Sequence, residues 1–161
     1  MNPKNMWLVG SMSAALVSGA VLLEGDYNKY LDPYKDIGGI PTVCSGHTGK
    51  DVVMGQKWTP EMCKAVLIKD LNKAGYGLLE CVNVPLDINQ FNALALFALN
   101  IGVPSFCKSN TVLKPLNQGR YEEAAKGMYK WVYVGGIYSK GLYNRRVKEY
   151  KIFHGEYSDI K

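Results

Sequence analysis

The sequence is poor in the residues that build metal sites. It contains only two histidines, His47 and His154, and its four cysteines include no Cys-x-x-Cys pair. A zinc site would need Cys44, His47 and Cys63 to converge with a fourth ligand, which is not a typical zinc-binding motif. We therefore expect neither a metal ion nor a cofactor.

Basic runs, internal repeats and low-complexity tracts are also absent. The formal net charge is +5 at pH 7, but the Lys and Arg residues are scattered and no aromatic stripe lies between them. Nucleic-acid binding is therefore not expected, and a lipid or cell-wall polymer surface suits the charge better. A chain of 161 residues is long enough for one domain with a hydrophobic core.

The longest uncharged stretch lies near the N-terminus. Residues 5–23 are 19 consecutive residues without a charge, close to the roughly 20 needed to cross a bilayer as a helix. Lys4 precedes this stretch and Glu24 follows it, which predicts a cytoplasmic N-terminus and a main domain on the other side. Eight of the 19 residues are Gly, Ala or Ser, so the span would be a weak permanent anchor. We predict a signal-anchor segment over residues 1–23 and the main domain over residues 24–161.

A cleavable signal peptide is the alternative for the same stretch. Ser18-x-Ala20 resembles the small-residue site at which such peptides are cleaved. Cleavage there would leave Glu24 four residues from a new terminus, where fraying is expected. A chemical role for Glu24 therefore favours the uncleaved segment, although the sequence leaves both possibilities open.

The cysteines are even in number and widely spaced, at positions 44, 63, 81 and 107. This pattern predicts two disulfides and an oxidising compartment such as a bacterial periplasm. Four cysteines allow three pairings, and the sequence alone does not choose among them. A thiol protease or amidase built on Cys44 and His47 is a weaker alternative, because catalytic pairs generally come from separate segments.

Local patterns predict an α+β domain with a small sheet followed by helices. Gly-rich and β-branched residues between positions 34 and 49 favour a small antiparallel sheet with tight turns. Thr59-Pro60 predicts a helix start, and residues 87–90 predict a capping box before an apolar core helix. Further helices are expected near residues 111–117, 121–131 and 140–154. Such an order is typical of a domain in two lobes.

Three residues could carry glycoside chemistry. Cleavage of a glycosidic bond needs one protonated carboxyl group and a second group across the sugar ring, for which Glu24, Asp36 and Thr42 are candidates. Composition alone does not prove this, because two acids and a threonine within 19 residues are common in surface loops. The aromatic residues Trp131 and Tyr133, with Tyr138, could stack on sugar, but we expect them in the core beside a terminal helix.

A family resemblance strengthens the chemical interpretation. The stretch "LLEG…YKDIGGIPTVCSGHTG" resembles the active-site signature of bacteriophage lysozymes, or endolysins, of glycoside hydrolase family 24. The segments "FALNIGVPSFCKSNTVLKPLNQGRYEEAAKGMYKW" and "GGIYSKGLYNRRVKEY" resemble later parts of that family, so the likeness covers residues 20–153. It implies a lysozyme-like, two-lobed monomer that hydrolyses the β-1,4 bond between N-acetylmuramic acid and N-acetylglucosamine in peptidoglycan.

The resemblance also implies a location. Residues 5–23 would hold the protein in the inner membrane of the host as in signal-anchor-release endolysins, with the N-terminus in the cytoplasm, until release into the periplasm. A lytic transglycosylase, which needs only the glutamate, and a non-enzymatic, membrane-tethered wall-binding protein are the alternatives.

Roles follow from the resemblance, residue by residue. Glu24 would be the general acid, Asp36 would stay ionised beside the attacking water, and Thr42 would orient that water. His47 would hold the Gly-rich turn beside the cleft and could contact substrate. The expected disulfides are Cys44 with Cys63, and Cys81 with Cys107.

One spacing departs from the family pattern. Eleven residues separate Glu24 from Asp36, whereas the family usually has eight. Asp32 lies nearer the usual spacing from Glu24, but its distance from Thr42 in the sequence is then wrong, so Asp36 is favoured. The extra residues would enlarge the loop that leads into the sheet.

Overall fold

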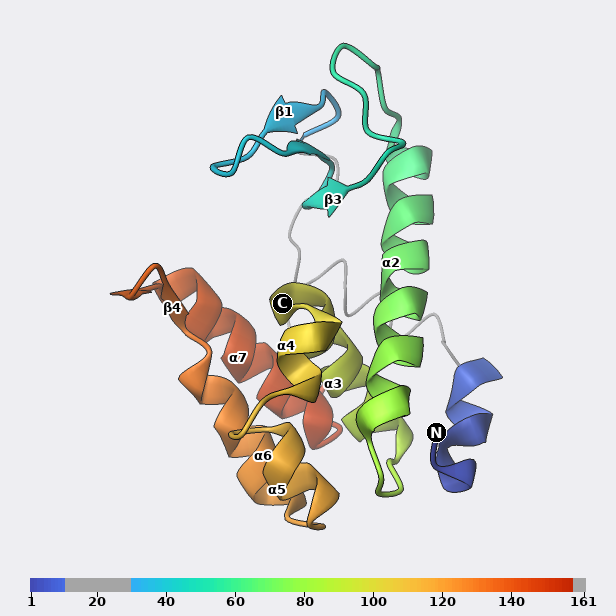
Figure 1. Cartoon of the computed structure of the whole chain (residues 1–161), viewed down its shortest axis with the longest axis vertical. Coiled ribbons are helices and arrows are strands. Elements are labelled where there is room, and N and C mark those ends of the chain that lie inside the picture. Colours follow the sequence, from blue (N-terminus) through green and yellow to red (C-terminus); the bar gives the residue numbers. More distant parts are fainter. Residues whose placement is uncertain (11–29, 158–161) are drawn as a thin grey trace. The chain divides into compact units, whose positions relative to one another are not determined.

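The computed structural model describes residues 1–10 and 30–157 (Figure 1). The chain divides into two compact units. We call Ala14–Leu71 the sheet unit, and Met1–Ser13 together with Asn72–Lys161 the helical unit. Each unit is described by itself below.

The sheet unit contains the small antiparallel sheet that the sequence predicts. Its strands are β1 (Tyr34–Lys35), β2 (Pro41–Val43) and β3 (His47–Thr48), in the order β1-β2-β3. Thr42 on the middle strand pairs with Tyr34 on one side and with Thr48 on the other. The sheet therefore fixes Thr42 from both sides.

A small hydrophobic core lies against this sheet. Val43, Val52 and Trp58 are buried there together with a disulfide between Cys44 and Cys63. The Cα atoms of the two cysteines are 5.5 Å apart, a usual separation for a disulfide. The bond joins the residue after β2 to the first turn of the next helix.

That helix is α2 (Pro60–Cys81), and it begins where the sequence predicts. Thr59 is the N-cap, because its hydroxyl accepts a hydrogen bond from the backbone N–H of Met62 at 3.2 Å. Leu67 and Leu71 are buried, whereas Met62 is exposed. In the described parts of the chain, neither α2 nor any other helix is long and apolar enough to cross a membrane.

The helical unit is organised around α3 (Ile88–Ile101), as the sequence predicts. Asp87 and Gln90 form the expected capping box, and every residue from Phe91 to Ala98 is buried. The other elements are α4 (Val103–Cys107), α5 (Leu113–Asn117), α6 (Tyr121–Gly127), the 3-10 helix η2 (Met128–Lys130), β4 (Tyr133–Val134), β5 (Ile137–Tyr138) and α7 (Lys140–Phe153).

Helix α7 packs against α3 through a buried ionic cluster. Arg145 and Arg146 lie 3.0 Å and 3.2 Å from the two carboxylate oxygens of Glu149. Arg145 also donates to the carbonyl oxygen of Leu96 on α3, and the guanidinium of Arg146 lies 4.8 Å from the ring centre of Phe97. The closing Arg-Arg-x-x-Glu pattern therefore joins two helices in the interior.

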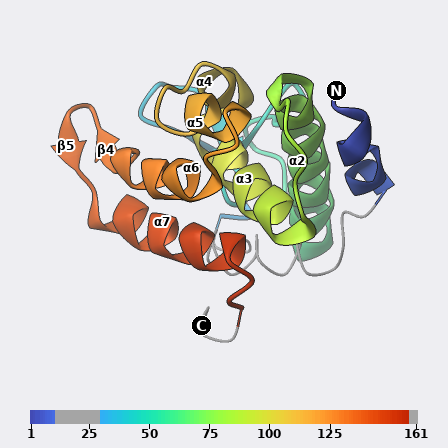
Figure 2. The ribbon, with the colours of Figure 1, turned by 90° about the horizontal axis from the view of Figure 1, so that it is seen from below.

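The β4–β5 hairpin between η2 and α7 is absent from the sequence prediction. It turns at Gly135 and Gly136, whose φ angles of 55° and 81° suit a two-residue hairpin turn. Tyr133 and Tyr138 face each other across it and are 60% and 52% exposed. The expectation that these two tyrosines lie in the core is therefore wrong. Figure 2 shows the hairpin at the common end of α6 and α7.

The first residues of the chain also belong to the helical unit. They form the 3-10 helix η1 (Pro3–Gly10). The side chain of Asn5 is fully buried, donates to the carbonyl of Val84 and accepts from the N–H of Leu86, both at 2.9 Å. Of the predicted membrane span, residues 11–23 lie outside the described residues.

Candidate active site

Asp36 lies directly after β1, at the turn into β2. The N–H of Ile40 donates to Asp36 Oδ1 at 2.9 Å, and the N–H of Asp36 donates to the carbonyl of Ile40 at 3.0 Å. Within the described residues, Asp36 Oδ2 makes no hydrogen bond. One carboxylate oxygen therefore fixes the turn, and the other can contact water or substrate.

The two glycines after Asp36 serve this turn. Gly39 has a φ of 76°, a left-handed conformation that favours glycine. A Cβ atom on Gly38 would lie 3.3 Å from Asp36 Oδ1, so a larger residue there would crowd the carboxylate. The Gly-Gly pair thus gives Asp36 its place at the edge of the sheet.

Thr42 lies on β2 with only 3% of its surface exposed. Its hydroxyl donates to the carbonyl of Ile40 at 2.9 Å. Because a hydroxyl carries one proton and two lone pairs, the Thr42 oxygen can still accept a hydrogen bond. Thr42 could therefore hold a water molecule by accepting one of its protons.

Asp32, the other candidate for the catalytic aspartate, makes different contacts from Asp36. Asp32 forms an exposed ion pair with Lys57, in which Nζ lies 2.7 Å from Oδ1. Asp36 instead bonds to Ile40 in the turn between β1 and β2, and the choice of Asp36 over Asp32 stays a prediction. Glu24 lies outside the described residues, so its role and its separation from Asp36 stay predictions.

His47 on β3 is 9% exposed, and both ring nitrogens have carboxylate neighbours. Nδ1 lies 2.7 Å from Asp70 on α2, and Nε2 lies 3.0 Å from Asp51. Burial lowers the pKa of His47, but the bonds to Asp70 and Asp51 outweigh burial and raise the pKa above 6.5. The bond to His47 in turn lowers the pKa of Asp51.

These contacts give His47 a structural role, because it joins the sheet to α2. Both ring nitrogens already bond to carboxylates. The assignment of His47 as a substrate-binding residue stays a prediction. Both partners were missed from the sequence: the four-residue spacing of Asp51 from His47 could have indicated the first, but no local signal indicates Asp70. The contact with Asp70 depends on how the chain folds back between β3 and α2.

The disulfides pair as the family resemblance implies. Cys44 is joined to Cys63 within the sheet unit, and Cys81 to Cys107 within the helical unit. All four cysteines belong to the described part of the chain, and none of them is a free thiol. A thiol protease or amidase based on Cys44 and His47 is therefore excluded. The described residues also contain no cluster arranged to hold a metal ion.

The small antiparallel sheet of one unit and the helical unit built on one buried helix are the parts of a lysozyme-like fold. The phage lysozyme family matches residues 26–149, and the chain belongs to this family. It is a muramidase, an enzyme that lyses peptidoglycan.

Individual relatives agree with this family. A SAR-endolysin of Pseudomonas phage phiKMV is 40% identical over 151 residues, which are 91% of each chain. A SAR-endolysin of Escherichia phage Mu is 44% identical over 122 residues, 76% of this chain and 70% of the relative. The muramidase domain of SpmX from Asticaccaulis excentricus has a similar structure, with a TM-score of 0.79 and 31% identity over 89% of this chain and 97% of that one.

Proposed function

We propose that this muramidase is an endolysin that hydrolyses the β-1,4 bond between N-acetylmuramic acid and N-acetylglucosamine and so causes host cell lysis. The observation that carries this proposal is the joint attachment of Asp36 and Thr42 to Ile40. It presents a carboxylate oxygen and a hydroxyl oxygen from one rigid turn. Relatives named SAR-endolysins, which align over most of their length, support the same function.

In this proposal Glu24 protonates the leaving glycosidic oxygen. A general acid must be protonated at the pH of the reaction, so the cleft should raise the pKa of Glu24. Positive charge then develops at the anomeric carbon of the muramic acid residue. The bond to the leaving oxygen breaks as this charge forms.

Asp36 and Thr42 act on the opposite side of the bond. Asp36 Oδ2 accepts a proton from the attacking water, while the Thr42 oxygen accepts its second proton as a hydrogen bond. The water's lone pair then points at the anomeric carbon. An inverting reaction of this kind needs carboxyl groups roughly 6.5–9.5 Å apart, to leave room for the water.

In this proposal the N-terminal segment delivers the enzyme to the periplasm. Residues 5–23 insert as a weak anchor in the host inner membrane, with the N-terminus in the cytoplasm, and later leave the bilayer for the periplasm. The two relatives named SAR-endolysins support this route. The bond that Asn5 donates to the carbonyl of Val84 and the bond that it accepts from the N–H of Leu86 also support it, because they cannot form while residues 5–23 cross a bilayer. The released enzyme acts on peptidoglycan as a monomer.

Analysis of the muropeptide products tests the reaction. Wild type should release fragments with a reducing N-acetylmuramic acid end, and mass spectrometry distinguishes these from the anhydro-sugars of a transglycosylase. Glu24→Gln should reduce turbidity loss of permeabilised cells to background. Anhydro-sugar products would establish the transglycosylase alternative, and unchanged lysis by Glu24→Gln would favour a non-enzymatic wall-binding role.

A further inference from the structure

The β4–β5 hairpin exposes an apolar tip that the proposed catalytic mechanism does not use. Ile137 is 75% exposed and Val134 is 60% exposed, on either side of Gly135-Gly136. None of these four tip residues has a side chain that can form a hydrogen bond. Figure 1 and Figure 2 both show the hairpin extending beyond the ends of α6 and α7. The tip is therefore accessible to a partner.

Aromatic side chains extend this apolar surface from the hairpin onto α7. The ring centres of Tyr133 and Tyr138 are 6.1 Å apart, and that of Tyr138 is 6.4 Å from the ring centre of Tyr143. All three tyrosines are exposed. A continuous exposed apolar surface is more informative than scattered single residues, because such surfaces mark interaction sites. We call it the hairpin patch, and its members are Tyr133, Val134, Ile137, Tyr138 and Tyr143.

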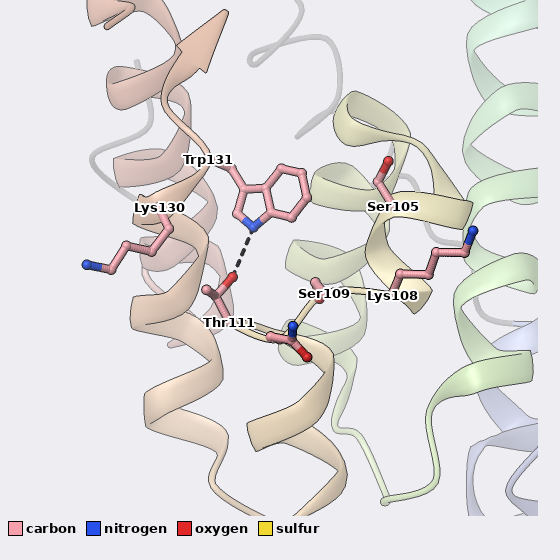
Figure 3. A pocket seen from close by; sticks show the side chains of 7 residues that line it. Ser105, Lys108, Ser109, Thr111, Lys130 and Trp131 are labelled. Atoms are coloured by element: carbon pink, nitrogen blue, oxygen red, sulfur yellow. Dashed lines mark hydrogen bonds between the residues drawn. The ribbon is translucent and has the colours of Figure 1, made fainter. Parts of the chain in front are cut away.

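The base of the hairpin is held firmly by the helical unit. The N–H of Ser139 donates to the carbonyl of Val132 at 2.8 Å, and the hydroxyl of Ser139 caps α7. Trp131 donates its Nε1–H to the hydroxyl of Thr111 at 3.0 Å, as Figure 3 shows. The ring of Trp131 also packs edge-on against Phe97 of the core helix. Because the base is fixed, little conformational entropy is lost when the tip binds a partner.

The charge beside the hairpin patch is positive. Lys130 precedes the hairpin and Lys140 follows it, and both are exposed without an ion-pair partner among the described residues. Between residues 88 and 148 the only acidic residues are Glu122 and Glu123, and each of them pairs with a basic residue. The hairpin patch therefore attracts an anionic partner.

We propose that the hairpin patch docks on an anionic lipid bilayer. Val134 and Ile137 enter the boundary between headgroups and acyl chains, where an apolar side chain is favoured. The tyrosines lie at the level of the headgroups, because the ring of tyrosine is apolar and its hydroxyl is polar. Lys130 and Lys140 lie against the lipid phosphates. That this bilayer is the host inner membrane rests on the proposed function, whereas the docking itself does not require the reaction.

Two other occupants match the hairpin patch less well. A second copy of the chain, docked through the same hairpin about a two-fold axis, would bring the lysines of both copies together, and like charges repel. A glycan presents many hydroxyl groups, but the side chains of residues 134–137 cannot bond to them. A bilayer supplies apolar chains and negative charge together, so it matches both features.

Vesicle binding by the purified released enzyme tests the docking. Vesicles that contain phosphatidylglycerol should bind wild type more tightly than vesicles of phosphatidylcholine alone. Val134→Thr/Ile137→Thr keeps both side chains β-branched but adds hydroxyl groups, and it should weaken binding to the anionic vesicles by on the order of tenfold. Lys130→Gln/Lys140→Gln should weaken this binding by on the order of tenfold and reduce the preference for anionic lipid.

A matched pair of substitutions in the sheet unit provides the control. Val53→Thr/Ile37→Thr makes the same two changes at exposed positions outside the hairpin patch and should leave vesicle binding unchanged. Any binding through residues 5–23 is common to all of these proteins, so it does not distinguish one double variant from another. Equal vesicle affinities of the hairpin variant and this control would overturn the proposal.

A spin label reports directly on the depth of the tip. Val134→Cys and Val53→Cys each supply one thiol for labelling, because the four native cysteines are paired in disulfides. With anionic vesicles, the label on Val134→Cys should become more accessible to oxygen, which concentrates in the bilayer, than to a nickel chelate, which stays in water. The label on Val53→Cys should not change. A label on Val134→Cys that stays equally accessible to the nickel chelate would overturn the docking.

Two further outcomes would identify a different occupant and overturn the proposal. Peptidoglycan fragments that immobilise the label on Val134→Cys, when vesicles do not, would make the substrate the partner. A dimer in sedimentation equilibrium that Val134→Thr/Ile137→Thr dissociates would make the partner a second copy. Docking is measured without peptidoglycan, so its failure is separate from failure of the reaction. If wild type releases no muropeptides while its hairpin enters vesicles, the proposed function fails and the docking stands.

Discussion

Asp36 and Thr42 are bonded to opposite ends of the same residue. The N–H of Ile40 donates to the carboxylate of Asp36, and the carbonyl of Ile40 accepts the hydroxyl proton of Thr42. Both side chains are therefore held to one residue, which restricts their motion relative to each other. Such rigidity suits a pair of groups that must hold one water molecule.

Loss of the Thr42 hydroxyl should affect catalysis more than folding. We expect Thr42→Val to lower kcat by on the order of 10²-fold, because the attacking water loses one of its two acceptors. The free energy of unfolding should fall by only about 1 kcal/mol, the net value of one hydrogen bond. The rate of turbidity loss of permeabilised cells measures the effect on catalysis, and urea unfolding measures the effect on stability. Thr42→Ser keeps the hydroxyl, and a severe loss of kcat in this variant would contradict the assigned role.

The two aspartates near the sheet should respond differently to the same change. Asp36→Asn should lower kcat by about 10²-fold to 10⁴-fold, since an amide cannot accept the proton from water. Asp32→Asn removes an exposed ion pair with Lys57, which contributes about 0–1 kcal/mol, and should leave kcat unchanged. If Asp32→Asn were the inactive variant, the assignment of Asp36 would be wrong.

His47 should make stability depend on pH between neutral and mildly alkaline conditions. Its pKa is raised in the folded protein, so protonated His47 stabilises the fold fully below about pH 6.5, and this contribution is lost as the pH rises through the raised value. Asp51 has a lowered pKa and acts in the opposite direction, but only at acidic pH near its ordinary value. The free energy of unfolding should therefore fall from pH 5.5 to pH 9 more steeply in wild type than in His47→Asn.

Two further variants isolate this effect. Asp70→Asn removes the shorter of the two bonds to His47, and at pH 5.5 it should cost about 1.5–3 kcal/mol, the usual value for a hydrogen bond to a charged group. His154 also has a raised pKa, because the carbonyl of Tyr150 and the carboxylate of Glu122 outweigh its burial. His154 therefore adds to the same pH dependence, and the share of His47 is measured by comparing His154→Asn with the double variant His47→Asn/His154→Asn. Parallel pH profiles for these two proteins would contradict the assignment.

Local signals in the sequence predicted much of the fold but not the contacts between distant segments. Thr59 and the 87–90 capping box act within one helical turn, so their outcome is visible in a short stretch of sequence. The bond between His47 and Asp70 spans 23 positions and depends on tertiary packing. Tyr133 and Tyr138 were expected in the core beside a terminal helix, whereas the hairpin that turns at Gly135-Gly136 exposes both side chains.

The two disulfides should contribute similar stability but different function. Cys44–Cys63 and Cys81–Cys107 span 19 and 26 positions, and each should stabilise the fold by about 3 kcal/mol in the chain-entropy account. Removal of either pair by Cys→Ala substitution should therefore lower the free energy of unfolding by a comparable amount.

Activity distinguishes the two bonds. Cys44 lies two residues after Thr42, so removing Cys44–Cys63 loosens the strand that carries a candidate catalytic group. We expect kcat to fall in that variant at a temperature where both variants remain folded by circular dichroism. Equal kcat values would show that β2 keeps its place through the sheet and the His47 contacts alone.

The contacts of Asn5 predict that the first residues of the chain stabilise the released enzyme. Asn5→Ala leaves the carbonyl of Val84 and the N–H of Leu86 without their side-chain partner, which costs about 1–3 kcal/mol for a buried polar group. Asn2→Ala is the matched control, because the two bonds of the Asn2 side chain, to the carbonyl of Asn83 and from the N–H of Lys4, are both more exposed. Urea unfolding of the purified released enzyme should give a lower midpoint for Asn5→Ala than for Asn2→Ala. Equal midpoints would show that η1 adds no stability through Asn5, and support for the release route from these contacts would be lost.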